Sequence, residues 1–209
     1  MLQAAPRDLR MEALVEVLDG RRTVTFTHMH SDILSVLRLA KNLTLESSFS
    51  TWDAWKVADE IAKASVPSSI IVIDSPGGKL ETRDVSIENG AALEKVGALV
   101  GFHTDDGVTD SRFFLRSAAL AVRAGMSREK ALYGMTMANA IMLDLQNRIG
   151  TLEAGKDADF IVLSGDPLSV YSKVLETWVE GNKVFDRSNP KDKLYAVGGY
   201  GASHDSAPL

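Results

Sequence analysis

The chain has 209 residues, of which 45% are hydrophobic and 24% charged, a composition typical of folded globular proteins and not of disordered or collagen-like ones. Its net charge of -5 and the absence of a long lysine or arginine run argue against a nucleic-acid partner, which requires clustered positive charge. No stretch approaches the roughly 20 apolar residues that span a bilayer, so we expect no membrane partner.

The beginning of the chain, MLQAAPRDLRMEALVEVL, reads as a charged amphipathic helix and not as a signal peptide. For the chain as written we therefore expect a cytoplasmic location, although a fragment of an exported protein would have lost its signal. Because there is no cysteine, any metal ion must be held by imidazole and carboxylate groups.

Between residues 9 and 125 the sequence repeats one plan, a short apolar or β-branched run followed by a segment with helical spacing. The four runs that we expect to be strands are residues 23–28, 43–47, 69–74 and 98–104. Strands that alternate with helices and are apolar on both faces indicate a parallel sheet covered by helices. This is an α/β fold with about four βα units, whereas a complete (β/α)8 barrel takes roughly 250 residues.

The texture of the sequence changes after the sheet. Two helices are expected first, with Ser127 as the cap of the first one. Beyond residue 148, short strands separated by Gly, Asp, Asn and Pro predict an antiparallel β segment, with Gly181 and Asn182 as a two-residue hairpin turn. Residues 188–209 are rich in small polar residues and are expected to form a flexible tail.

Polar side chains follow the ends of two predicted strands. His28 and His30 lie at the end of the first strand, and the stretch GFHTDDGVTD places His103 and Asp105 at the end of the last. The carboxyl ends of parallel strands form the ligand-binding edge of α/β folds, and imidazole with carboxylate suits a hydrolytic divalent metal. The alternative is structural, because Asp-Asp-Gly is also a good turn sequence and a histidine at such an edge can simply hydrogen-bond.

Three longer stretches resemble the metal-dependent amidohydrolase superfamily. GTLEAGKDADFIVLSGDPL (150–168) resembles the signature that closes the small β domain of that superfamily, and TDDGVTDSRFFLRSAALAVRAGMSREKAL (104–132) resembles its last barrel strand and helix. THMHSDILSVLRLAKNL (27–43) resembles the fifth strand and helix of the imidazolonepropionase-like branch. The resemblance extends to about residue 187.

The resemblance implies a fold and a division into domains. Residues 1–148 would be the C-terminal half of a (β/α)8 TIM-type barrel, strands five to eight. Residues 149–187 would be part of a small β-sandwich, and residues 188–209 the tail.

It also implies a chemistry, the hydrolysis of a C–N bond in a small amide, cyclic amide or dipeptide by water activated on a divalent metal, with zinc expected. Asp105 would be the catalytic residue and a metal ligand, and His28 the second ligand. His30, His103 and Glu46 would contact the substrate or serve as accessory ligands.

The chain departs from the superfamily pattern in three places. The paired histidines of the first barrel strand and the bridging residue of the fourth have no counterpart, and the strand-six histidine is absent from LTLESSFST, which offers Glu46, Ser47, Ser48 and Ser50. An alternative function is therefore a non-catalytic remnant or scaffold. Exposed sheet edges predict association, either as a homo-oligomer or with a complementing N-terminal half. A dinucleotide binder is disfavoured because the PGG at 76–78 lacks the GxGxxG spacing.

Overall fold

The computed structural model of the chain describes residues 8–43, 47–73, 82–106 and 108–197, with the backbone alone for residues 26–28 and 43. The chain divides into two compact units, Met1–Met142 and Leu143–Leu209, which we describe separately. Within the described residues, every helix is too short or too polar to cross a membrane.

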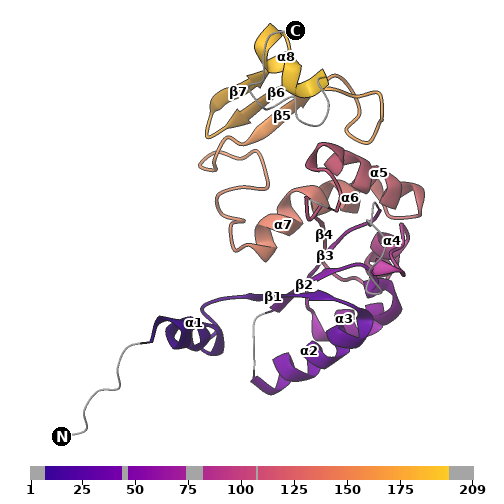
Figure 1. The fold of residues 1–209 in the computed structure, drawn as a ribbon, viewed down its shortest axis with the longest axis vertical. Coiled ribbons are helices and arrows are strands. Elements are labelled where there is room, and N and C mark those ends of the chain that lie inside the picture. The colour runs from indigo at the N-terminus through magenta and orange to yellow at the C-terminus, as the bar shows by residue number, and fades with distance from the viewer. Residues whose placement is uncertain (1–7, 44–46, 74–81, 107, 198–209) are drawn as a thin grey trace, which may run out of the picture. The chain divides into compact units, whose positions relative to one another are not determined.

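The first unit is the expected alternation of strands and helices (Figure 1). Its strands are β1 (Val24–His28), β2 (Ser47–Thr51), β3 (Ser68–Ile70) and β4 (Val100–Phe102). Its α-helices are α1 (Leu9–Leu18), α2 (His30–Leu43), α3 (Ala58–Ala64), α4 (Asn89–Lys95), α5 (Phe114–Arg123), α6 (Arg128–Met135) and α7 (Met137–Met142). Two 3-10 turns, η1 (Ala54–Val57) and η3 (Ser111–Phe113), precede α3 and α5.

The four strands form one parallel sheet in the order β1-β2-β3-β4, as the sequence predicts. Within the described residues β1 and β4 each have one strand neighbour, so closure of this sheet into a barrel stays a prediction. Ser127 caps α6 as expected, because its hydroxyl accepts a hydrogen bond from the Lys130 backbone N–H at 3.2 Å.

The second strand lies later in the sequence than predicted. It was expected at residues 43–47, of which 44–46 lie outside the described residues. Leu43 ends α2, and the strand is found at Ser47–Thr51. The strand SSFST is mostly Ser and Thr, yet four of its five residues are buried. A strand that buries hydroxyls is not marked by hydropathy, so the apolar residues upstream attracted the prediction.

The core of the first unit lies between the sheet and its helices. α2 packs on β1, and α6 and α7 pack on β4. The largest buried apolar side chains come from β2, α3, β3 and its continuation, α4 and β4: Phe49, Ile61, Ile70, Ile71, Leu93 and Phe102. This core fixes the sheet that carries the candidate site.

The second unit holds the antiparallel sheet that the sequence predicts, with strands β5 (Phe160–Leu163), β6 (Val174–Val179) and β7 (Asn182–Asp186). The hairpin turn differs by one residue from the prediction. Val179 pairs with Asn182, so the loop residues are Glu180 and Gly181, both with positive φ (49° and 75°). Two consecutive positive φ angles give the turn whose twist matches the flanking strands.

Two further features belong to the second unit. A helix that was not predicted, α8 (Pro190–Val197), lies within the residues expected to form the tail. The signature residues Asp157 and Asp159 have structural contacts, because Asp157 pairs with Arg148 at 2.6 Å and Asp159 accepts the Glu180 N–H at 2.7 Å.

Truncation of the core is the first test of this fold. Phe49 is 1% exposed, so Phe49→Ala should lower the free energy of unfolding of the first unit by about 3–5 kcal/mol through lost burial and a cavity. Urea titration followed by the fluorescence of Trp52 and Trp55 measures it. The matched control is Phe113→Ala, because Phe113 is 47% exposed and should cost far less. Equal losses in the two variants would contradict the assigned core.

Candidate functional site at the carboxyl edge of the sheet

The register of the sheet brings the carboxyl ends of all four strands level. Along one row His28 lies opposite Thr51, Thr51 opposite Ile70, and Ile70 opposite Phe102. The residues that follow these positions therefore emerge at one edge of the sheet. This is the edge at which parallel α/β proteins bind ligands.

His103, directly after β4, is held by two serines from the neighbouring strands. Its Nε2 lies 2.7 Å from Ser50 Oγ and its Nδ1 lies 2.9 Å from Ser69 Oγ. Ser50 and Ser69 are opposite each other in the register of β2 and β3. Because hydroxyls both donate and accept, this pair satisfies either tautomer of the ring.

The surroundings of His103 favour its neutral form. Burial of the ring lowers the pKa of His103 to about 4, and the negative charge of Asp105 raises it only in part. The imidazole is therefore neutral near pH 7, with one nitrogen donating and the other accepting. Both nitrogens are occupied by serine hydroxyls, so His103 has no free nitrogen for a ligand in this arrangement.

Asp105 lies on a tight turn that follows β4. Asp105 and Asp106 both have positive φ (53° and 29°), a conformation that aspartate tolerates better than most residues. The turn is closed by hydrogen bonds from the Thr109 N–H to the Thr104 carbonyl at 3.0 Å and from the Thr109 hydroxyl to the Ile73 carbonyl at 2.8 Å. The second bond ties the turn to the segment that follows β3.

The two aspartates of the turn differ in their contacts. Asp106 accepts a hydrogen bond from the Ser111 hydroxyl at 2.6 Å and so belongs to the start of η3. Within the described residues the Asp105 carboxylate has no hydrogen-bond or ion-pair partner. Of these two aspartates, Asp105 is the one whose carboxylate is available, and its predicted role stays a prediction.

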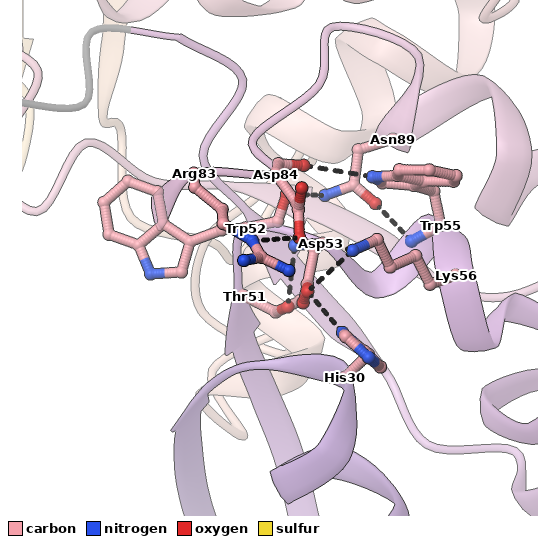
Figure 2. A network of polar contacts seen from close by, with 9 residues as sticks. All are labelled: His30, Thr51, Trp52, Asp53, Trp55, Lys56, Arg83, Asp84 and Asn89. Atoms are coloured by element: carbon pink, nitrogen blue, oxygen red, sulfur yellow. Dashed lines mark hydrogen bonds and ion pairs between the residues drawn. The ribbon is translucent and has the colours of Figure 1, made fainter. Parts of the chain in front are cut away.

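His30 joins a second polar group, which Figure 2 shows. Its Nδ1 lies 2.7 Å from Oδ2 of Asp53, whose side chain is 1% exposed. Asp53 lies between β2 and η1, two residues after the end of the strand. Lys56 Nζ lies 4.0 Å from the same oxygen, and it also pairs with Asp84. Arg83 Nε contacts Asp84 at 3.2 Å, so charges of opposite sign alternate along the group.

Asn89 fixes the backbone around this group. Its side-chain oxygen accepts the Trp55 N–H at 2.9 Å, and its amide donates to the Trp52 carbonyl at 3.3 Å (Figure 2). Asn89 is fully buried at the start of α4. The Asn89 side chain therefore holds the backbone on each side of Asp53, at Trp52 and at Trp55.

The structure describes the side chains of three of the five predicted site residues. His30, His103 and Asp105 are described at the expected edge. For His28 the structure gives the backbone at the end of β1 and no side chain, and Glu46 lies outside the described residues. The roles of all five stay predictions.

The described residues offer part of the donor set for a divalent metal ion. The nitrogen of His30 and the oxygen of Asp105 are of the kind that such an ion takes. No three His, Asp or Glu residues in the described part of the chain lie close enough together to hold one. A complete site would need His28 or a donor from beyond the described residues.

The sequence analysis did not single out Asp53, Lys56 or Ser69. Asp53 and Lys56 were assigned to the start of a helix, because the strand before them was placed four residues too early. Asp53 would have been found from its place just beyond the carboxyl end of β2, where polar residues often belong to a site. The pairing of Ser69 with His103 depends on strand order, which periodicity does not give.

A parallel sheet that gathers imidazole and carboxylate groups at its carboxyl edge defines the class of α/β proteins whose sites suit hydrolysis. The chain belongs to the amidohydrolase family, whose model matches residues 16–189. Members of this family generally depend on a metal ion.

Several known proteins are similar to the chain. An amidohydrolase from Thermotoga maritima MSB8 has 32% sequence identity and a TM-score of 0.83, over 88% of this chain and 49% of that one. A β-aspartyl dipeptidase from Fervidobacterium islandicum-AW-1 shares the fold, with a TM-score of 0.62 at 15% identity, over 84% and 51%. "Adenine deaminase 2" of Shouchella clausii (strain KSM-K16) is 39% identical over 95 residues, 43% of this chain and 16% of the relative. The chain thus spans about half of these structures and less of that curated relative.

The serine contacts of His103 give a test of the site's geometry. Ser69→Ala removes the partner of Nδ1 and should cost about 1–3 kcal/mol, because a buried polar atom loses its hydrogen bond. Its neighbour Ser68 is a matched control, since the buried Ser68 hydroxyl has no partner within the described residues and Ser68→Ala should be nearly neutral or stabilising. Urea unfolding measures both, and a larger loss in Ser68→Ala would be inconsistent with the bond.

Proposed function

We propose that this chain supplies the strand-five-to-eight part of a metal-dependent amidohydrolase that hydrolyses a C–N bond in an amide, a cyclic amide or a dipeptide. The observation that carries the proposal is the place of Asp105. Its carboxylate has no partner in the described structure, and it sits on a fixed turn at the carboxyl edge, within the region that matches the family.

Asp105 has the chemistry of a proton carrier. Amide hydrolysis requires a base that takes a proton from the attacking water and an acid that delivers one to the leaving nitrogen. A single carboxylate beside the reacting atoms performs both steps in turn. The turn that holds Asp105 fixes it in space, so that it need not be ordered during the reaction.

A divalent ion, for which we propose zinc, would be held by His28 and Asp105, with His30 as a further nitrogen donor. Such an ion supplies a water of lowered pKa and polarises the substrate carbonyl. The remaining ligands of a typical catalytic zinc, which takes three protein ligands, would come from outside the described residues.

The substrate class rests on the known relatives. A prolidase and a β-aspartyl dipeptidase share the fold of this chain at 15% identity, and a deaminase is related in sequence over 95 residues. We propose a small amide or a dipeptide as the first substrates to be tested.

The second candidate is a non-catalytic chain, and one observation favours it. Ser50 lies on the strand where the superfamily pattern has a metal-binding histidine that this chain lacks, and its hydroxyl contacts His103. The hydrogen bond between the Ser50 hydroxyl and the neutral His103 ring forms without a metal ion. This arrangement would preserve the fold without the chemistry.

Association is part of the proposal, because α1 exposes an apolar stripe. The residues on this stripe have the spacing of one helix face and are all exposed: Met11, Leu14, Val15 and Leu18. No residue of α1 is buried. We propose that a second copy of this chain covers α1 and the edge of β1, which pairs only with β2 among the described strands.

Replacement of the proposed proton carrier tests the function. In the zinc-loaded protein, Asp105→Asn should lower kcat on its best dipeptide or cyclic amide by about 10²–10⁴-fold, because asparagine keeps the turn but can neither take nor deliver a proton. Asp106→Asn is the matched control on the same turn and should keep most of the rate. A wild-type chain that turns over none of these substrates, alone or with a polypeptide carrying barrel strands one to four, would favour the non-catalytic function.

Light scattering tests the association. The chain has a mass of 22.6 kDa, so a solution mass of twice that value is expected for the wild type. Leu14→Glu should restore the mass of one chain, because it places a charge in the apolar stripe. Leu152→Glu, at another exposed leucine outside α1, should leave the mass unchanged. A monomeric wild type would contradict self-association and leave a complementing polypeptide as the partner.

A further inference from the structure

His30 differs from His103 in what its two ring nitrogens contact. His30 Nδ1 lies 2.7 Å from the Asp53 carboxylate, and within the described residues its Nε2 has no hydrogen-bond partner. His103 has both nitrogens bound to serine hydroxyls. His30 is therefore the described histidine with a nitrogen available for a ligand, and its side chain is 33% exposed.

The contact with Asp53 decides which nitrogen of His30 is available. An ionised carboxylate accepts hydrogen bonds and donates none, so Nδ1 must carry the hydrogen in this bond. When the ring carries one proton, Nε2 then holds a lone pair. A hydroxyl partner would leave the tautomer open, as it does for His103.

Asp53 is an unusual residue to find buried. Burying a carboxylate is costly unless it is paired and hydrogen-bonded, and Asp53 Oδ1 has no partner within the described residues. Oδ2 alone meets His30, with Lys56 Nζ 4.0 Å away. Lys56 is held in turn by Asp84 (Figure 2). An arrangement with one orphaned oxygen is a poor device for stability, and it directs the carboxylate at His30.

The backbone at His30 is fixed as well. His30 is the first residue of α2 and follows the end of β1 after one residue, Met29. The Met29 carbonyl accepts the N–H groups of Asp32 and Ile33, and Ile33 is buried in the core. The backbone of His30 is thus fixed by the start of α2, and its ring is fixed by the hydrogen bond to Asp53.

We propose that Asp53 is a positioning residue that fixes His30 as the Nδ1–H tautomer, so that His30 Nε2 is a ligand for the divalent metal ion. This inference rests on the proposed metal-dependent function. Metal-binding histidines usually donate their other ring N–H to a carboxylate or carbonyl, which sets the tautomer and strengthens the ligand. The His30–Asp53 pair has this form.

The test is nitrogen NMR of ¹⁵N-histidine-labelled full chain, in mildly alkaline buffer, with and without zinc. We expect His30 to be protonated at Nδ1 and not at Nε2, and zinc to shift the Nε2 signal of His30. The variant His30→Gln assigns the signal. A wild-type His30 protonated at Nε2, or an Nε2 signal that zinc leaves unchanged, would overturn the proposal without any variant of Asp53.

Asp53→Asn separates positioning from charge. It should weaken zinc binding, measured by calorimetry, by about 10–100-fold and remove the zinc-dependent shift of His30 Nε2. The matched control is Asp32→Asn, which removes the same charge two residues from His30 at an exposed position in the first turn of α2. Equal weakening in the two variants would overturn the proposal. Circular dichroism shows whether Asp53→Asn is folded. If this variant is unfolded, the NMR spectra of the wild type decide the proposal.

The outcomes also separate this inference from the proposed function. Zinc on His30 Nε2 without hydrolysis of any amide would support the inference and contradict the proposed activity. Hydrolysis that survives in His30→Gln at the wild-type rate and zinc affinity would do the reverse.

Discussion

The level carboxyl ends of four parallel strands are the constraint on which the candidate site depends. Because His28, Thr51, Ile70 and Phe102 stand in one row, the residues after each strand emerge at a single edge. A shift of one residue in any pairing would turn side chains to the opposite face of the sheet. The buried core under the strands, with Phe49 and Ile70 at its centre, maintains this register. The position of Asp105 and the contacts of His103 both follow from it.

Two histidines at this edge are used in different ways. His103 is enclosed by hydroxyl groups from β2 and β3, and burial keeps it neutral. His30 is held by a buried carboxylate, and its Nε2 has no partner among the residues that the structure describes. The first arrangement links β2 and β3 to the residue that follows β4. The second leaves Asp53 Oδ1 without a hydrogen-bond partner in the described part of the chain. A buried carboxylate oxygen of this kind lowers stability, so we attribute Asp53 to the binding role proposed for the His30–Asp53 pair.

The exposed apolar stripe of α1 and the incomplete set of metal donors both bear on whether the chain acts with a partner. Among the described residues no three acidic or imidazole side chains lie close enough together to hold a metal ion, and α1 buries none of its residues. The chain matches about half the length of its structural relatives. Both observations agree with a chain that works together with a partner, as proposed above.

The sequence by itself determined the βα alternation, the antiparallel sheet and the place of Asp105 and His30 after their strands, because periodicity and turn residues are local signals. It misplaced β2, because a strand made of Ser and Thr lacks the apolar pattern, and it placed the hairpin turn one residue too late. Only the tertiary structure decided that Ser50 and Ser69 enclose His103 and that Asp53 holds His30. Those contacts join residues 23 to 53 positions apart. Such pairings are set by strand order and register, which depend on packing across the whole sheet and have no local signature.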